Sequence, residues 1–295
     1  MQGALARGRG LPGRLLLFAV LSAALAGLWY GTSLQAMAAV ARAPWSAAEE
    51  GLVHRWGVLG LCLVWLWLKR RVIGAGMRAG PHRGYAAFGL ACLLTSPLWF
   101  SPGDLLLAMV GVFALVFGRG AAVPALLLGI YSFAVVLPVA VEQYAAEPYA
   151  GIVAAPAALV LDSLGYALVR DGLELRFATA SGEALRVSVT AACAGPATMG
   201  LFLALFALML LDRPLPAALA VPVFLVGVVG TWCQTLVRTL VLVLTGHYFG
   251  LAALWSAHEV SGYLLFSAWY AAFAVFYLHQ AQREHRSAVA LPARA

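Results

Sequence analysis

Long apolar runs separated by short polar breaks dominate the chain. A helix needs about 20 mostly apolar residues to cross a hydrocarbon core of roughly 30 Å, and the sequence supplies such runs repeatedly. We expect eight spans, over Arg14–Tyr30, Val53–Leu68, Gly84–Phe100, Leu105–Phe117, Ala121–Val139, Ala197–Leu211, Ala217–Val243 and His258–Leu278. The pattern predicts an all-α polytopic membrane protein that forms a single integral membrane domain over residues 1–295.

One long polar interval, residues 141–192, interrupts the apolar pattern between the fifth and sixth expected spans. Its first part, Tyr149–Val169, predicts an interfacial helix. Apolar and polar residues then alternate over 174–177 and again over 185–189, on either side of the turn Ala180-Ser181-Gly182. Alternation around such a turn predicts a β-hairpin. We expect this helix and hairpin to form an extracytoplasmic insertion.

The composition agrees with a lipid environment, since 63% of the residues are hydrophobic and 11% are charged. Soluble domains carry roughly 25% charged residues. The net charge of +7 does not indicate nucleic-acid binding, because the basic residues are spread over loops and form no stripe with interleaved aromatics. The expected partner of the apolar surface is the lipid bilayer.

The distribution of charge predicts the orientation, because Lys and Arg mark cytoplasmic loops. With both termini inside, 13 of the 19 basic residues lie in inner segments and ten of the 12 acidic residues lie outside. The start of the chain, with Arg7 and Arg9 before an apolar stretch, imitates a cleaved signal peptide. We expect this first span to be retained, in a multi-pass protein of the inner (plasma) membrane, because its loss would spoil the charge pattern.

Cys193 has the most informative setting among the four cysteines, which show no metal-ligand spacing and no disulfide framework. It follows the hairpin and precedes Gly195 and Pro196, which suit a tight turn and the first turn of a helix. Peptide dipoles at a helix amino terminus stabilise the thiolate, which is the nucleophilic form of cysteine. The alternative is a small residue packed at a tight junction.

Arg238 lies about 21 residues into an apolar run, roughly 32 Å along a helix, which places it near the outer boundary of the membrane. One interpretation is a preorganised cation that faces the protein interior. The other is an arginine that snorkels to the headgroups.

His258 opens the eighth expected span, and Gly262 follows four residues later on the same helix face, where we expect it to clear space beside the imidazole. Histidine is an acid or base near neutral pH, although many interfacial histidines are structural hydrogen bonders. Cys193, Arg238 and His258 come from three different segments and fall at the same predicted membrane face. That coincidence indicates one shared site.

These residues resemble the motifs of the exosortase/archaeosortase family. Cys193-Ala194-Gly195 is similar to its Cys-Ser-Gly motif, Thr235-Leu236-Val237-Arg238 to its Asn-x-x-Arg motif, and His258-Glu259-Val260-Ser261-Gly262 to its His-x-x-x-Gly motif. The resemblance extends from about Ala146 to Tyr277. Two positions depart from the pattern, Ala194 in place of serine and Thr235 in place of asparagine, and both remove polar groups beside the expected site.

The resemblance implies a cysteine transpeptidase-like enzyme that cleaves a carboxyl-terminal sorting signal of exported proteins, made of a short motif, a transmembrane helix and a basic cluster. Cys193 would form a thioester, Arg238 would stabilise the oxyanion, and His258 would act as general acid and base. Gly195, Thr235 and Gly262 would support them. The implied partners are the tailed substrate and an acceptor nucleophile, with no metal or cofactor.

Three alternatives remain open at this point. A transporter or channel would use Arg238 to bind an anionic substrate. A non-catalytic component of envelope polysaccharide export would need the helices without the thiol. An intramembrane thiol protease would release the new carboxyl end by hydrolysis.

Overall fold

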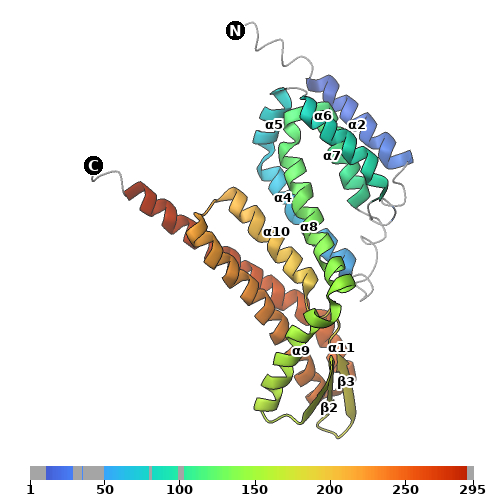
Figure 1. Ribbon diagram of the computed structural model, residues 1–295, viewed down its shortest axis with the longest axis vertical. Helices are drawn as coiled ribbons and strands as arrows, with labels where there is room; N and C mark the ends of the chain where they lie inside the picture. Colours follow the sequence, from blue (N-terminus) through green and yellow to red (C-terminus); the bar gives the residue numbers. More distant parts are fainter. Residues whose placement is uncertain (1–10, 29–34, 36–49, 80–81, 99–102, 291–295) are drawn as a thin grey trace. The chain divides into compact units, whose positions relative to one another are not determined.

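The computed structural model describes residues 11–28, 35, 50–79, 82–98 and 103–290. The chain divides into two compact units, Met1–Phe133 and Ala134–Ala295 (Figure 1). Helices make up nearly all of both units, and a small sheet belongs to the second. The expectation of a single domain over residues 1–295 stays a prediction.

The first unit is helical throughout its described parts. Its elements are α2 (Leu11–Leu28), α4 (Glu50–Leu68), α5 (Arg70–Ala79), α6 (Arg83–Thr95), η2 (Ser96–Leu98), α7 (Gly103–Phe117), η3 (Gly118–Ala121) and the start of α8 (Ala122–Tyr144). Gly89 of α6 and Gly111 of α7 let these helices meet closely, since a Cβ on Gly89 would lie 2.6 Å from the Gly111 carbonyl oxygen. Arg70, Arg71 and Arg78, among the basic residues that we expected in loops, belong to helix α5.

The second unit carries the segments singled out by the sequence motifs. It contains the end of α8, then α9 (Ala146–Ser163), β1 (Leu168–Asp171), β2 (Glu174–Ala178), β3 (Ala184–Ser188), α10 (Pro196–Asp212) and α11 (Ala217–Ala290). Helix α11 breaks at Gly250, whose φ of 81° and ψ of −176° are not helical. We call residues 217–249 the first arm and residues 251–290 the second arm.

The two arms of α11 fold back on each other beside α10 (Figure 1). Two glycines of the first arm make the close approach possible. A Cβ on Gly227 would lie 2.1 Å from the Phe202 ring, and a Cβ on Gly230 would lie 2.0 Å from the Trp269 ring. The Trp269 indole N–H donates to the Thr231 hydroxyl at 3.1 Å. Small residues and an interhelical hydrogen bond are what hold membrane helices together without a hydrophobic driving force.

Within the described residues the sheet has three antiparallel strands in the order β1-β2-β3. The expected hairpin is confirmed as β2 and β3, and Leu175, Phe177 and Leu185 are buried on one face as the alternation predicted. Strand β1 was not expected. The predicted helix to Val169 is wrong at its end, because Gly165 leaves the helical region with φ +85° and the chain then pairs with β2.

The seventh span was expected to end at Val243, which is too early. In the structure the first arm stays helical up to the break at Gly250. Contacts with the sheet explain the extension. His247 Nδ1 lies 2.6 Å from the Ala178 carbonyl oxygen, and the Ala180 N–H donates to the His247 carbonyl at 2.8 Å. The second bond satisfies one of the carbonyls left over at a helix carboxyl end. His258 lies inside the second arm, two helical turns beyond the break at Gly250.

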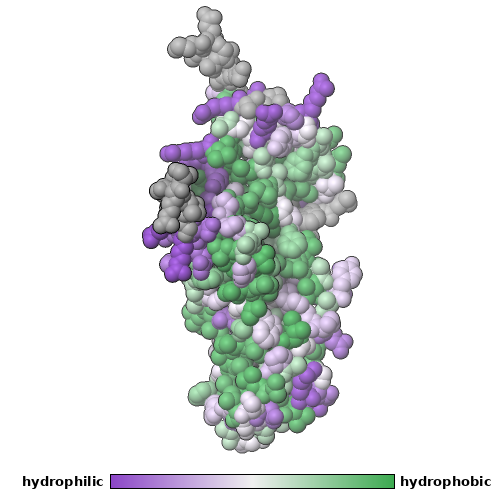
Figure 2. Space-filling view, turned by 60° about the vertical axis from the view of Figure 1, so that its left-hand side comes forward, coloured by the Kyte–Doolittle hydropathy of each residue, from purple (hydrophilic) through white to green (hydrophobic). Residues whose placement is uncertain are grey.

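Three helical stretches in the described part of the chain are long and apolar enough to cross a membrane: Asp104–Tyr144, Ala217–His258 and Val260–Arg286. Shorter apolar helices cover Leu11–Gly27, Arg55–Leu68 and Pro196–Asp212. Hydrophobic side chains cover large areas of the visible surface (Figure 2). On α11 alone Leu225, Val229 and Val275 are more than half exposed, as expected for a surface that faces lipid. The count of eight spans stays a prediction.

A tight turn joins the sheet to α10. The Ala194 N–H donates to the Thr190 carbonyl at 3.0 Å, and Gly195 adopts φ +87° immediately before Pro196. Pro196 begins α10 without loss, because the first helical N–H has no partner within a helix. Gly195 is required twice, by its left-handed backbone and by space, since a Cβ there would lie 2.6 Å from the Thr235 hydroxyl oxygen.

We predict that Gly195→Ala destabilises the protein by about 1–3 kcal/mol from backbone strain alone, with a further loss from the clash with Thr235. Thermal unfolding in detergent measures the effect. Gly165→Ala is the matched control, because Gly165 has φ +85° but open space around its Cβ position. Adding Thr235→Ala should restore part of the stability lost in Gly195→Ala. Equal losses at positions 165 and 195 would show that the contact with Thr235 is unimportant.

Candidate functional site

A cavity of about 390 Å³ lies between β3, the turn that follows it, and both arms of α11. This volume falls in the usual range for ligand-binding pockets. Cys193, Arg238 and His258 all line it. The remaining lining residues are Leu185, Arg186, Val187, Ser188, Val189, Thr190, Thr239, Leu242, Leu251, Leu254 and Trp255. The three side chains singled out from the sequence therefore meet in one cavity.

Cys193 sits in the turn between β3 and α10, where it is partly buried and not disulfide-bonded. Its N–H donates to the Thr190 hydroxyl at 3.3 Å, which ties the residue back to the end of the sheet. Helix α10 begins three residues later at Pro196. Cys193 is thus held close to the amino terminus of α10.

Arg238 lies on the first arm and reaches across to the second. Its Nη2 donates to the His258 carbonyl oxygen at 3.2 Å. The guanidinium also lies against Gly262, where an added Cβ would be 3.4–3.5 Å from its Cζ, Nε and Nη2 atoms. The guanidinium thus lines the cavity between the two arms, as the interpretation of an inward-facing cation expects.

Gly262 lies beside a different group from the one we expected. We expected this glycine to clear space beside the imidazole of His258, but the guanidinium of Arg238 lies beside Gly262. His258 is held by other contacts, among them the Trp255 ring, whose centroid is 5.7 Å from that of the imidazole in an edge-to-face arrangement. The two rings share one face of the second arm, since they are three residues apart.

Thr235 supports the turn and does not line the cavity. It is 2% exposed, lies under Gly195, and its hydroxyl donates to the Thr231 carbonyl at 3.1 Å. Ala194, the other departure from the family motif, is 3% exposed. It packs in an apolar cluster with Leu175 and Phe177 of β2 and with residues of α9 and α11. An alanine suits that cluster because a buried hydroxyl needs a hydrogen-bond partner.

Several lining residues were not singled out from the sequence, notably Arg186, Thr190, Thr239 and Trp255. Trp255 has a detectable signal in its three-residue spacing to His258 on a helix. Arg186 has only its place in the alternating strand. Within the described residues the lining carries two arginines and no carboxylate. Among the described residues, the charged groups of the lining are therefore cationic.

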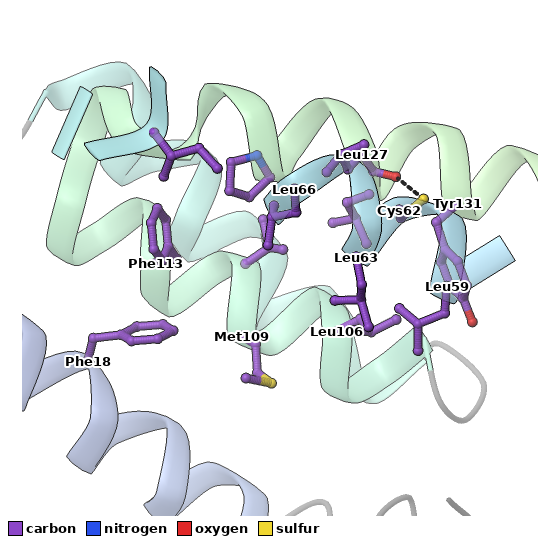
Figure 3. Close-up of a pocket in the computed structure, with 14 residues that line it drawn as sticks. Phe18, Leu59, Cys62, Leu63, Leu66, Leu106, Met109, Phe113, Leu127 and Tyr131 are labelled. Atoms are coloured by element: carbon purple, nitrogen blue, oxygen red, sulfur yellow. Dashed lines mark hydrogen bonds between the residues drawn. The ribbon is translucent and has the colours of Figure 1, made fainter. Parts of the chain in front are cut away.

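The other three cysteines lie elsewhere. Cys62 lines an apolar cavity of about 290 Å³ in the first unit with Phe18, Phe113 and Tyr131 (Figure 3). Its thiol is buried and lies 3.9 Å from the Leu127 carbonyl oxygen. Cys92 is buried, and Cys233 is exposed on the first arm of α11. Neither of these two lines the cavity that contains Cys193.

Comparison with known proteins identifies the family. The sequence model of the transmembrane exosortases matches residues 45–276, which is more than half of the chain and includes all three motifs. The searches of curated proteins and of solved structures gave no match. The matched range includes the sheet, the cavity and both arms of α11 down to Phe276. This chain is a membrane protein and belongs to the transmembrane exosortase family.

Proposed function

We propose that this chain is a cysteine transpeptidase that removes the carboxyl-terminal sorting tail of exported proteins at the outer face of the inner membrane. The observation that carries the proposal is the shared cavity, to which three separate segments contribute Cys193, Arg238 and His258. Membership of the exosortase family, whose members process sorting signals, supports the same function. The tail would consist of a short recognition motif, one transmembrane helix and a basic cluster.

The reaction begins when the thiol proton of Cys193 passes to the imidazole of His258. The resulting thiolate attacks the scissile carbonyl carbon. A new C–S bond forms and the carbonyl oxygen becomes an oxyanion. Collapse of this intermediate breaks the C–N bond, and His258 returns the proton to the leaving amine. The products of this half-reaction are the free tail and a thioester on Cys193.

The second half-reaction transfers the new carboxyl end. His258 takes a proton from the acceptor nucleophile, which attacks the thioester and releases the Cys193 thiol. Arg238 stabilises the oxyanion in both steps, and its bond to the His258 carbonyl holds the guanidinium in place beforehand. Water as acceptor would give hydrolysis. The mass of the new carboxyl end of the processed protein distinguishes transfer from hydrolysis.

We predict that Cys193→Ser inserts normally but does not process a tailed substrate, because a serine hydroxyl is a far weaker acid than a thiol and forms no anion at neutral pH. The measurement is the loss of the tail from a tagged exported protein that ends in a motif, an apolar helix and an arginine cluster. Cys233→Ser is the matched control and should process at the wild-type rate. Normal processing by Cys193→Ser would exclude catalysis by this cysteine.

The orientation is tested by labelling. In a variant with Cys62→Ala, Cys92→Ala and Cys233→Ala, activity should remain, and a membrane-impermeant maleimide added from outside should abolish it by alkylating Cys193. The cavity that contains Cys193 is partly lined by exposed polar residues such as Arg186 and Thr190, so the reagent has access. Labelling of Cys193 only after the cytoplasmic side is opened would contradict the proposed topology.

Arg238→Lys should lower the processing rate on the order of 10²–10³-fold, the effect of one lost oxyanion donor. The planar guanidinium can bind the His258 carbonyl oxygen and an oxyanion at the same time. The lysine ammonium is a compact point charge and does not reproduce this two-sided contact. The rate is measured at wild-type expression, with insertion checked by protease protection. Arg213→Lys, near the end of α10, is the control for loss of a guanidinium outside the site. A rate for Arg238→Lys within about threefold of wild type would remove Arg238 from the mechanism.

A further inference from the structure

Strand β3 has a free edge. It is the last strand in the order β1-β2-β3, and in the part of the chain that the structure describes no strand pairs with its far side. The Val189 N–H donates to the Leu173 carbonyl at 3.0 Å, and the Glu183 carbonyl accepts from Thr179 at 2.7 Å. Residues 183, 185, 187 and 189 therefore direct their backbone groups to β2. By alternation, the N–H and C=O groups of Ala184, Arg186 and Ser188 point to the free edge.

This free edge runs along the cavity that contains Cys193. Six consecutive residues, 185–190, line the cavity. Successive side chains of a strand point to opposite faces of the sheet, so a cavity that touches all six must follow the edge of the strand. The opposite wall is formed by residues of α11, including Leu251 and Leu254. The cavity is thus a groove with one wall of unpaired backbone groups.

The direction of β3 matters for chemistry. The strand ends at Ser188, and the turn with Cys193 follows within five residues. A peptide paired with β3 would extend along the groove at about 3.3 Å per residue and reach the turn. Its backbone would be held extended beside the thiol, as cleavage of a peptide bond requires.

Charge favours a peptide with an acidic side chain. Arg176 and Arg186 are cross-strand partners on the polar face of the sheet. Arg176 is paired with Asp171 at 2.7 Å and Glu174 at 3.0 Å. Within the described residues Arg186 has no such carboxylate, although it is exposed and lines the groove. A side chain directly opposite Arg186 on an added strand would supply the missing negative charge.

We propose that the substrate segment next to the scissile bond binds by β-strand addition to the free edge of β3, as a fourth strand with an acidic side chain opposite Arg186. This proposal rests on the proposed function, because it assumes a peptide substrate. Main-chain hydrogen bonds to residues 184, 186 and 188 provide the affinity, and the side-chain contacts provide the specificity.

The first test removes one edge donor. Ser188→Pro deletes an N–H that points into the groove and leaves the pairing of β3 with β2 intact, as prolines on edge strands do. The substrate is the tagged protein that the wild-type enzyme shortens. For Ser188→Pro its KM should rise about tenfold, or the processing rate at low substrate should fall about tenfold, which is the effect of one lost hydrogen bond. The control is Arg170→Pro on the opposite edge of the sheet, in β1, which should process normally. Wild-type kinetics in inserted Ser188→Pro would overturn the proposal.

The second test does not depend on turnover. In a chain with all four native cysteines replaced by alanine, Ser188→Cys is paired with single cysteines placed along the substrate segment, and disulfides are formed by mild oxidation. Strand addition predicts crosslinks at every second substrate position, and a shift by two positions when the enzyme cysteine moves to residue 186. Crosslinks without this period, or none to a segment that the wild type processes, would overturn the proposal. Ser181→Cys, in the turn before β3, is the control and should give none.

The two proposals fail in different ways. If Cys193→Ser processes the tagged protein normally while crosslinks to β3 keep their two-residue period, the chemistry is wrong and strand addition stands. If Cys193→Ser is inactive and the crosslinks show no period, the chemistry stands and strand addition is wrong.

Discussion

The break at Gly250 is the constraint on which the site depends. Arg238 and His258 belong to one helical segment and are 20 residues apart, a distance of about 30 Å in a straight helix. Because Gly250 adopts φ 81°, the second arm folds back along the first, and Arg238 Nη2 comes within 3.2 Å of the His258 carbonyl oxygen. Glycine tolerates this conformation at little cost. The close packing at Gly227 and Gly230 then keeps the two arms together.

The sheet positions Cys193 relative to the two arms of α11. The inner faces of β2 and β3 pack with α9 and the arms of α11 in one apolar cluster, which includes Leu175, Phe177, Ala194, Val243 and Leu254. Because Ala194 is part of that cluster, the neighbouring Cys193 is fixed relative to both arms. Gly195, pressed against Thr235, closes the turn at the start of α10. In the proposed reaction, this preorganisation would let Cys193 and Arg238 act without rearrangement.

The two departures from the family motif are compatible with this arrangement. Threonine at position 235 is small enough to lie under Gly195 and satisfies its own hydroxyl within the helix. Alanine at position 194 is directed into the apolar cluster and away from the groove. Neither Ala194 nor Thr235 is part of the lining of the cavity that contains Cys193.

The sequence was sufficient for features that repeat or that stand alone as chemistry. Apolar runs predicted the helices, alternation predicted β2 and β3, and motif spacing brought attention to Cys193, Arg238 and His258. Strand β1 has only four residues, too few for a period to be seen. The helical extension to Gly250 was missed because Gly246 and His247 are typical of loops, and only contacts with the sheet hold them in a helix. The contact of Gly262 with Arg238 depends on the folding back of α11, which no local pattern encodes.

The family, the shared cavity and the geometry of the turn lead to one central claim, that Cys193 carries the substrate as a thioester. The most direct measurement is mass spectrometry of the Cys193 peptide after brief reaction with a tailed substrate and rapid acid quenching. The account predicts that this peptide carries the new carboxyl end of the substrate and that hydroxylamine releases it, with no adduct when His258 is replaced by alanine. Processing of the substrate that continues after the Cys193 thiol has been blocked, and without an adduct on Cys193, would contradict the claim.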